Sequence, residues 1–358
     1  MRYNLFVLML LLALLAACQT EAATGTPEPE ADPEAEADPE AVSGSADSEL
    51  IVYSGRSESL VGPIIEQFKA ETGIEVQVRY GGTAEIAATI LEEGQNSPAD
   101  VFYAQDPGGL GAIQAAGLLA TLPDELLSQV PTRFASADGQ WVGISGRARV
   151  IAYNTDTVMP DDLPDDLTGF TEPQWQGRMG LAPTNGSFQA MVTGMRVIWG
   201  EERTREWLEG IIANEPIYFE GNTPIVAAVA AGEIDVGFVN HYYLYRFLAE
   251  EGEGFKARNH FLPGGGPGSL IMVSGAGILN TAEHPEAAET FIEYLLSMEA
   301  QQYFANETYE YPVIEGVSTE ASLPPLAELD AQAVDVNLSD LADLAGTAAL
   351  LSEVGMLP

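Results

Sequence analysis

Apolar and polar residues alternate along the chain in a pattern that predicts repeated strand and helix units. Residues 50–53 form a short apolar run typical of a buried strand, and residues 60–72 carry apolar side chains at helical spacing. Residues 74–80 and 84–93 repeat this pair, and residues 99–103 predict a third strand. Successive units of this kind indicate an α/β fold with a mainly parallel sheet flanked by helices.

The second part of the chain repeats this pattern with a different sequence. Residues 148–153 predict a strand that crosses between two lobes, and residues 270–273 predict the crossing back. Between them, Thr223-Pro224 marks a helix start with Thr as cap, and residues 234–239 predict a strand. Because ligands of open α/β sheets bind beyond the carboxyl ends of the strands, we expect a site in the loops there.

The first 49 residues differ in composition from the rest. Arg2 precedes an apolar run that ends at Cys18, which predicts a secretory signal, residues 1–18, too short to span a membrane. The small residues before Cys18 resemble the bacterial lipobox, so we expect this cysteine to be lipidated; its chance position in a hydrophobic leader is the alternative. Residues 19–49 are rich in Pro, Glu, Asp and Ala, which predicts a disordered acidic tether.

Charge and cysteine content narrow the function classes. The net charge is −40 with only 14 Lys and Arg residues, which argues against nucleic acid and anionic lipid as partners. Cys18 is the single cysteine, so no disulfide forms within the chain. The remaining length, about 310 residues, exceeds one ordinary core and suggests two lobes.

Motifs of common enzymes are absent from the sequence. It contains no G-x-S-x-G, H-E-x-x-H or Walker motif, and its three histidines are far apart. Asp106 and Glu58 are conceivable as an acid-base pair, but nothing activates a nucleophile. We therefore expect a binding protein and not an enzyme.

Two adjacent phenols, Tyr242 and Tyr243, follow the predicted strand of residues 234–239. A phenolate is a hard anionic oxygen, and a bound trivalent cation can deprotonate a phenol directly. Hard cations prefer oxygen ligands, so ferric iron is the natural candidate. The alternative is that one ring packs in the core and the other covers a surface.

An anion site is the second candidate feature. Two phenolates leave one positive charge on Fe(III), which a small anion can neutralise. Asn185-Gly186-Ser187 at a predicted helix start offers free N–H groups and a hydroxyl, although a simple helix cap explains it equally well. Asn222 and Asn240 can add donors or serve as turn residues.

Several segments resemble the ferric-iron-binding proteins of bacterial ABC importers, and the match covers nearly all of residues 50–316. The segments are Val52-Tyr53-Ser54-Gly55-Arg56, Asn96-Ser97-Pro98-Ala99-Asp100-Val101-Phe102, Ser145-Gly146-Arg147-Ala148-Arg149-Val150 with Tyr153-Asn154-Thr155, Pro183-Thr184-Asn185-Gly186-Ser187-Phe188, Val239-Asn240-His241-Tyr242-Tyr243 and Tyr309-Glu310-Tyr311-Pro312.

The resemblance implies a two-lobed periplasmic-binding-protein fold of the class II type, with the ligand in the interlobe cleft and closure by hinge motion. We expect an N-terminal lobe of residues 50–147 plus 268–300 and a C-terminal lobe of residues 148–267 plus 301–358. It also implies that Tyr242 and Tyr243 bind Fe(III), with a synergistic anion, carbonate or phosphate. Asn185, Gly186, Ser187, Asn222 and Asn240 match positions that hold this anion in part of the family.

The sequence departs from the family where the N-terminal lobe supplies ligands. Many relatives have a His after the first strand, where this chain has Ser57 and Glu58, and others a Glu where it has Gln105. Gln105, Glu58 and Ser57 are our candidate metal ligands there. Three arginines near the expected cleft can bind the anion through their forked donors or form salt bridges instead. They are Arg56, Arg147 and Arg149.

The sequence thus predicts a high-affinity extracytoplasmic receptor that captures Fe(III) and delivers it to an ABC permease with its ATPase. We expect a monomer, lipid-anchored to the cell membrane in the periplasm or on the outer face. The alternative is a metal-free receptor for an oxyanion or small organic acid on the same fold.

Overall fold

The structure, a computed structural model, describes residues 49–319, 323–330, 333–334 and 336–357. The predicted signal, Cys18 and nearly all of the predicted tether lie outside the described residues. None of the described helices is both long and apolar enough to cross a membrane.

Strands and helices alternate as the hydrophobic pattern predicts. The strands are β1 (Glu49–Ser54), β2 (Glu75–Tyr80), β3 (Val101–Ala104), β4 (Val142–Asn154), β5 (Met179–Leu181), β6 (Ile217–Tyr218), β7 (Val236–Asn240), β8 (Ala257–His260), β9 (Ile271–Ile278) and β10 (Tyr311–Pro312). The helices are α1 (Glu58–Thr72), α2 (Thr83–Glu93), α3 (Pro107–Ala115), α4 (Asp124–Leu127), α5 (Gly186–Trp199), α6 (Glu201–Ala213), α7 (Asn222–Ala231), α8 (Tyr242–Glu251), α9 (Pro285–Leu295), α10 (Met298–Asn306), α11 (Leu326–Asp330) and α12 (Leu344–Glu353).

Local signals set several helix ends. Gly73 ends α1 and Gly232 ends α7, both with positive φ, which glycine adopts without a steric penalty. The predicted start of α7 is wrong by two residues. Gly221 is its N-cap and Asn222 its first residue, so Thr223 lies inside the first turn. This shift brings the side chain of Asn222 to the helix end that faces β7.

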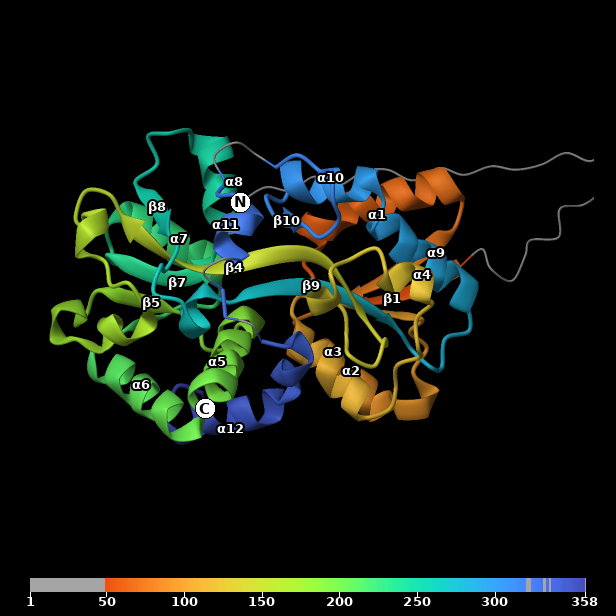
Figure 1. Cartoon of the computed structure of the whole chain (residues 1–358), viewed down its shortest axis with the longest axis horizontal. Coiled ribbons are helices and arrows are strands. Elements are labelled where there is room, and N and C mark those ends of the chain that lie inside the picture. Colours follow the sequence, from red (N-terminus) through yellow and green to blue (C-terminus); the bar gives the residue numbers. More distant parts are fainter. Residues whose placement is uncertain (1–48, 320–322, 331–332, 335, 358) are drawn as a thin grey trace, which may run out of the picture. The chain divides into compact units, whose positions relative to one another are not determined.

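The strands form one sheet in the order β2-β1-β3-β9-β4-β7-β5-β6, with β10 and β8 also paired to β4. The outer strands are parallel on both sides, as predicted, whereas β9 and β4 run antiparallel to their neighbours. We call β2, β1, β3 and β9 the first half of the sheet and β7, β5 and β6 the second half. The long strand β4 pairs with β9 in its first part and with β7 and β8 in its last part, so it joins the halves (Figure 1).

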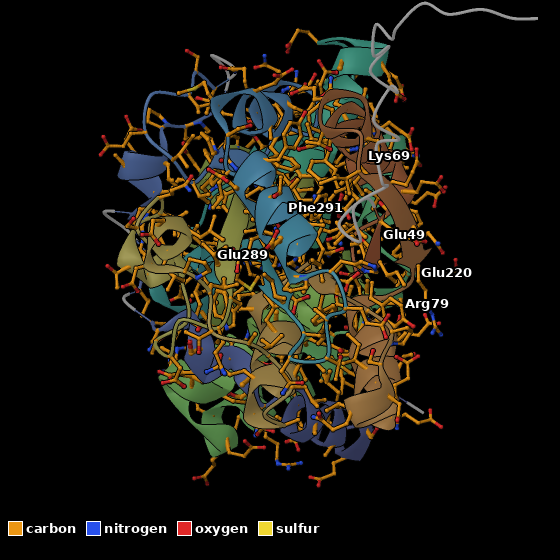
Figure 2. The ribbon with its side chains drawn as sticks, turned by 90° about the vertical axis from the view of Figure 1, so that its right-hand side faces the viewer. Glu49, Lys69, Arg79, Glu220, Glu289 and Phe291 are labelled. Atoms are coloured by element: carbon orange, nitrogen blue, oxygen red, sulfur yellow. The ribbon has the colours of Figure 1, made fainter. Side chains whose placement is uncertain are left out.

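Helices cover both faces of the first half. α1 and α9 lie on one side and α2 and α3 on the other (Figure 1). Phe291 of α9 packs edge-on against Phe68 of α1, with ring centroids 5.1 Å apart, and Figure 2 shows Phe291 from the side of this helix pair. Figure 2 also labels Lys69, which forms ion pairs with Glu66 and Glu75, and Arg79, which pairs with Glu93.

The buried apolar residues divide in the same way. One cluster consists mainly of buried side chains from the first half and the helices that cover it, and two further clusters consist mainly of buried side chains from the second half. Phe304, Tyr311, Leu329 and Leu341 belong to the first cluster, whereas Leu350 and Leu351 pack in a second-half cluster. This packing favours placing the described residues between 301 and 341 with the first half and not with the second. The lobe boundaries themselves stay a prediction.

Candidate functional site

The two adjacent tyrosines open α8 directly behind the carboxyl end of β7. Their rings stack with centroids 4.4 Å apart and an interplanar angle of 28°. Tyr242 is fully buried and Tyr243 is half-buried. Although Tyr242 follows a strand of the second half, its side chain packs in the cluster of the first half. The Tyr242 hydroxyl has no hydrogen-bond partner. Packing explains the ring of Tyr242 but not a buried, unpartnered hydroxyl.

Electrostatics favour the neutral form of Tyr243 in the absence of a cation. Burial and the neighbouring Tyr242 raise the pKa of Tyr243 well above its usual value, although Arg56 and Arg147 act in the opposite direction. Two phenolates side by side would repel each other and lack solvation. A trivalent cation between them reverses both penalties, because it binds only the deprotonated oxygens.

Three buried guanidinium groups surround the phenols. Arg56 follows β1, while Arg147 and Arg149 alternate on β4 and therefore point to the same face of that strand. Arg56, Arg147 and Arg149 are at most 2% exposed. Burial lowers the pKa of Arg149 to about 10 although both tyrosines favour its charge. Each arginine keeps two N–H-bearing nitrogens without a partner.

Glu310 compensates two of these arginines, and the sequence analysis gave it no role. Its carboxylate accepts from Arg56 Nη2 at 2.5 Å, from Arg147 Nη2 at 3.2 Å and from the Thr308 hydroxyl at 2.9 Å. Burial alone would raise the pKa of Glu310, but Arg56 and Arg147 outweigh it and lower the pKa below the usual value. The salt-bridge alternative thus holds for Arg56 and Arg147 in part, since each has donors left over.

The predicted anion-binding residues of the second half meet in one hydrogen-bonded network. Arg149 Nη1 donates to the side-chain oxygens of Asn240 at 2.9 Å, Ser187 at 3.2 Å and Asn222 at 3.4 Å. Asn185 caps α5 by accepting from the Ser187 backbone N–H, and its oxygen also accepts from Asn222 Nδ2 at 3.1 Å. Asn185 therefore caps α5 and also orders residues that surround unpartnered donors of Arg149 and Asn240. We call Asn185, Gly186, Ser187, Asn222 and Asn240 the cradle.

Asp106 of the first half faces this cradle. It precedes α3 and is 1% exposed, and neither carboxylate oxygen has a hydrogen-bond partner. A Cβ added to Gly186, the first residue of α5, would lie 2.9 Å from Asp106 Oδ2. Burial raises the pKa of Asp106 to about 6, although Arg147 and the nearby N–H groups of Gly108 and Gly109 lower it. The sequence analysis considered Asp106 only as part of an unsupported acid-base pair.

The candidate ligands of the first half are placed less favourably. Gln105 is half-buried with an unpartnered Nε2, and its backbone N–H donates to the Thr83 hydroxyl. Ser57 and Glu58 are exposed at the start of α1. Burial raises the pKa of Tyr80, and the nearby charge of Glu58 raises it further. The structure therefore brings Gln105 near Asp106 and does not join Ser57 or Glu58 to the tyrosines.

His241 anchors the start of α8. Its Nδ1 accepts from the Ala148 N–H at 3.1 Å, its Nε2 lies 2.8 Å from the Tyr309 carbonyl oxygen, and its ring stacks on Tyr311. Because Nδ1 accepts, Nε2 carries the proton and donates to Tyr309. Burial lowers the pKa of His241 to about 4, so the ring is neutral at pH 7. It is a positioning residue, tying the tyrosines to β4.

A small cavity of about 240 Å³ reaches Tyr243 from the surface. Its lining comes from the first turns of α1 and α7 and from one face of α8, with the side chains of Ser59, Thr223, Tyr243, Arg246, Phe247 and Glu250. The cavity therefore borders Tyr243, whereas Tyr242 is not part of its lining.

The unpartnered groups together define the ligand chemistry. Buried polar atoms normally have partners, so a cluster of orphans indicates a ligand. The acceptors include Tyr242 Oη and both Asp106 oxygens, and the donors include nitrogens of Arg56, Arg147, Arg149 and Asn240. Acceptors of this kind suit a hard cation and the donors an oxyanion. No group of three or more His, Cys, Asp or Glu able to hold a metal exists among the described residues.

Comparisons with known proteins agree with this chemistry. Residues 63–331 match the family of bacterial extracellular solute-binding proteins. The chain is 32% identical over 316 residues to the Fe(3+)-binding periplasmic protein of Serratia marcescens, which covers 87% of this chain and 93% of that protein. It is 34% identical over 315 residues to iron uptake protein A1 of Synechocystis, covering 86% and 87%.

Solved structures give the same result. Iron-bound HitA from Pseudomonas aeruginosa shares 36% identity at a TM-score of 0.81, covering 86% of this chain and 99% of that one. A Trichodesmium protein in complex with iron and citrate shares 29% identity at a TM-score of 0.70, with the same coverage. The chain therefore belongs to the bacterial extracellular solute-binding proteins and, within them, to the ferric-iron-binding proteins of ABC importers.

Proposed function

We propose that the protein is an extracytoplasmic receptor that captures Fe(III) together with a small oxyanion and delivers it to an ABC permease and its ATPase. The observation that carries this proposal is the stacked pair of phenols, with a buried unpartnered hydroxyl, facing three buried guanidinium groups. A metal-free receptor would explain the guanidinium groups, but it leaves the buried hydroxyl of Tyr242 without a partner.

Tyr242 and Tyr243 bind the iron as phenolates. Gln105 is the first-half candidate for a further contact, while Ser57 and Glu58 are left out of the ligand set because both are exposed. The anion binds between the cradle and the guanidinium groups, where Asn185, Gly186, Ser187, Asn222 and Asn240 surround Arg149. There it supplies one or two oxygens to the iron.

Charge balance supports a doubly charged anion. The three guanidinium groups and Fe(III) carry six positive charges, and two phenolates with the buried carboxylates of Asp106 and Glu310 carry four negative ones. Two positive charges remain in a site with little solvent. Uncompensated buried charge is costly, so carbonate or hydrogen phosphate fits better than a singly charged anion.

The halves of the sheet correspond to two lobes that close on the ligand by hinge motion. The antiparallel strands β4 and β9 run through the centre, and segments on both sides line the site. Residues 1–18 act as the signal, Cys18 is lipidated, and the acidic residues 19–49 hold a monomeric receptor off the membrane.

A visible absorption spectrum of the purified protein, titrated with ferric citrate in phosphate or bicarbonate buffer, tests the proposal. Phenolate-to-iron charge transfer gives a broad band that rises to one equivalent. Tyr242→Phe and Tyr243→Phe each lose the band or weaken iron binding more than about 100-fold, since even outer contacts of metal ligands are worth about 10–100-fold.

Tyr245→Phe is the matched control, because Tyr245 lies on the same helix and its ring stacks on Tyr309. It keeps the band. A folded protein with no band in any of these buffers would overturn the proposal and favour a metal-free oxyanion receptor.

A further inference from the structure

Asp106 has an environment that capping does not explain. It stands at the N-cap position of α3, yet its side chain makes no capping hydrogen bond. Neither carboxylate oxygen has a partner at hydrogen-bond geometry, although Arg147 and the nearby N–H groups of Gly108 and Gly109 favour its charged form. A buried carboxylate compensated only in this way is unfavourable, which favours a functional state in which the ligand adds a donor or a cation.

The position of the carboxylate indicates that a bound oxyanion supplies the donor. It lies against Gly186, where a Cβ would stand 2.9 Å from Asp106 Oδ2, at the N-terminal end of α5. Asn185 and Ser187 of this same turn belong to the network around Arg149. Asp106 thus borders the anion cradle from the opposite half of the sheet, and a bound oxyanion would lie beside it.

A carboxylate only accepts hydrogen bonds, so an oxyanion beside it must offer a proton. Hydrogen phosphate does so through its P–OH group, and its other oxygens accept from the donors of the cradle. Sulfate at neutral pH has only acceptor oxygens and would meet the lone pairs of Asp106. A repulsive contact of this kind is an effective way to reject a competitor.

We propose that Asp106 makes the anion site selective for a doubly charged oxyanion that still carries a proton, such as hydrogen phosphate, over one that does not, such as sulfate. The proposal rests on the proposed function and identifies the class of its anion. Hydrogen phosphate meets both requirements of the site: two negative charges for the charge balance and one proton for Asp106.

The test compares the two anions as partners of iron in carbonate-free buffer. Wild-type protein, Asp106→Asn and Asp106→Ser are loaded with one equivalent of ferric ion, and phosphate or sulfate is titrated while the charge-transfer band is recorded. Asn and Ser are both good N-cap residues, so α3 keeps its start in each variant. Asp124→Asn, an exposed aspartate at the start of α4, is the control.

We expect wild type and Asp124→Asn to prefer phosphate over sulfate by at least about 10- to 100-fold, the value of one unsatisfied buried polar contact. In Asp106→Asn the preference collapses, because the amide donates to an unprotonated oxygen. Asp106→Ser, whose small hydroxyl can donate, also binds sulfate more tightly than wild type does.

Equal use of both anions by wild type, or an unchanged preference in Asp106→Asn, would overturn this inference while leaving the proposed function intact. Loss of the band in Asp106→Asn with both anions would overturn it too and would make Asp106 an iron ligand. Absence of the band in wild type with either anion would instead count against the proposed function.

Discussion

Replacing Glu310 by Gln should destabilise the protein strongly, although the side chain keeps its shape. Glu310 is fully buried and its two carboxylate oxygens bind Arg56 at 2.5 Å and Arg147 at 3.2 Å, both also fully buried. The variant removes the carboxylate that binds two buried guanidinium groups, although Asp106 still favours the charge of Arg147. Arg149 stands nearby as a third buried guanidinium. Breaking a buried ion pair from one side typically costs about 3–5 kcal/mol.

Thermal unfolding followed by circular dichroism measures this effect. At about 2 °C per kcal/mol for a chain of this size, Tm falls by roughly 6–10 °C. Glu307→Gln, an exposed neighbour three residues away, leaves Tm within about 1 °C. The double variant Arg56→Met with Glu310→Gln recovers part of the loss, because one orphan charge is removed.

The pH dependence gives a second check with a defined sign. Arg56 and Arg147 hold the pKa of Glu310 below its usual 4.5 despite its burial. Its contribution to stability is therefore fully present above that pH and is lost as pH falls through the lower folded-state pKa. The stability of wild type and Glu310→Gln should converge on acidification. A Glu310→Gln protein as stable as wild type at pH 7 would refute the argument that the carboxylate compensates buried charge.

Three further predictions follow from the site. Iron dissociates as pH falls below about 5 to 6, because protons compete for the phenolates and for the anion; retention of the absorption band at pH 3 would contradict phenolate binding. His241, with a pKa lowered to about 4, destabilises the fold as pH drops from about 6.5, by about 3 kcal/mol at the lower limit. Urea unfolding of His241→Gln should show a smaller loss over this interval than wild type, and parallel curves would argue against a buried neutral ring. In Gly186→Ala the new Cβ stands 2.9 Å from Asp106 Oδ2, so isothermal titration should show iron binding weakened at least about 10-fold with Tm nearly unchanged; full affinity would mean that the two loops separate freely.

Local signals in the sequence mark some residues of the candidate site. The tyrosine pair stands at the end of an apolar strand, and Asn185 and Ser187 stand at a helix start; capping and periodicity are properties of a few adjacent residues. The misplaced start of α7 shows the limit of this reasoning. Thr223-Pro224 fits the rule for a helix start, but the backbone begins the helix earlier at Asn222, whose side chain then bonds to residues of other elements.

Glu310 and Asp106 could not be recognised in this way, because their roles depend on partners remote in sequence. Glu310 lies 254 residues from Arg56 and 163 from Arg147 along the chain, and no local pattern marks it as buried. Ser57 and Glu58 show the opposite limit of sequence reasoning. They occupy the position where relatives place a ligand, but the first turn of α1 directs them to the surface.

The sequence by itself determined the α/β pattern, the order of the elements and the placement of two phenols behind a strand. These follow from hydrophobic period and turn chemistry, which act over a few residues. Only the tertiary structure decided which charges are buried together, which arginine donors remain free and which carboxylate faces the cradle. Those outcomes depend on the mutual burial of side chains from distant elements, and burial sets the cost of an unpaired charge.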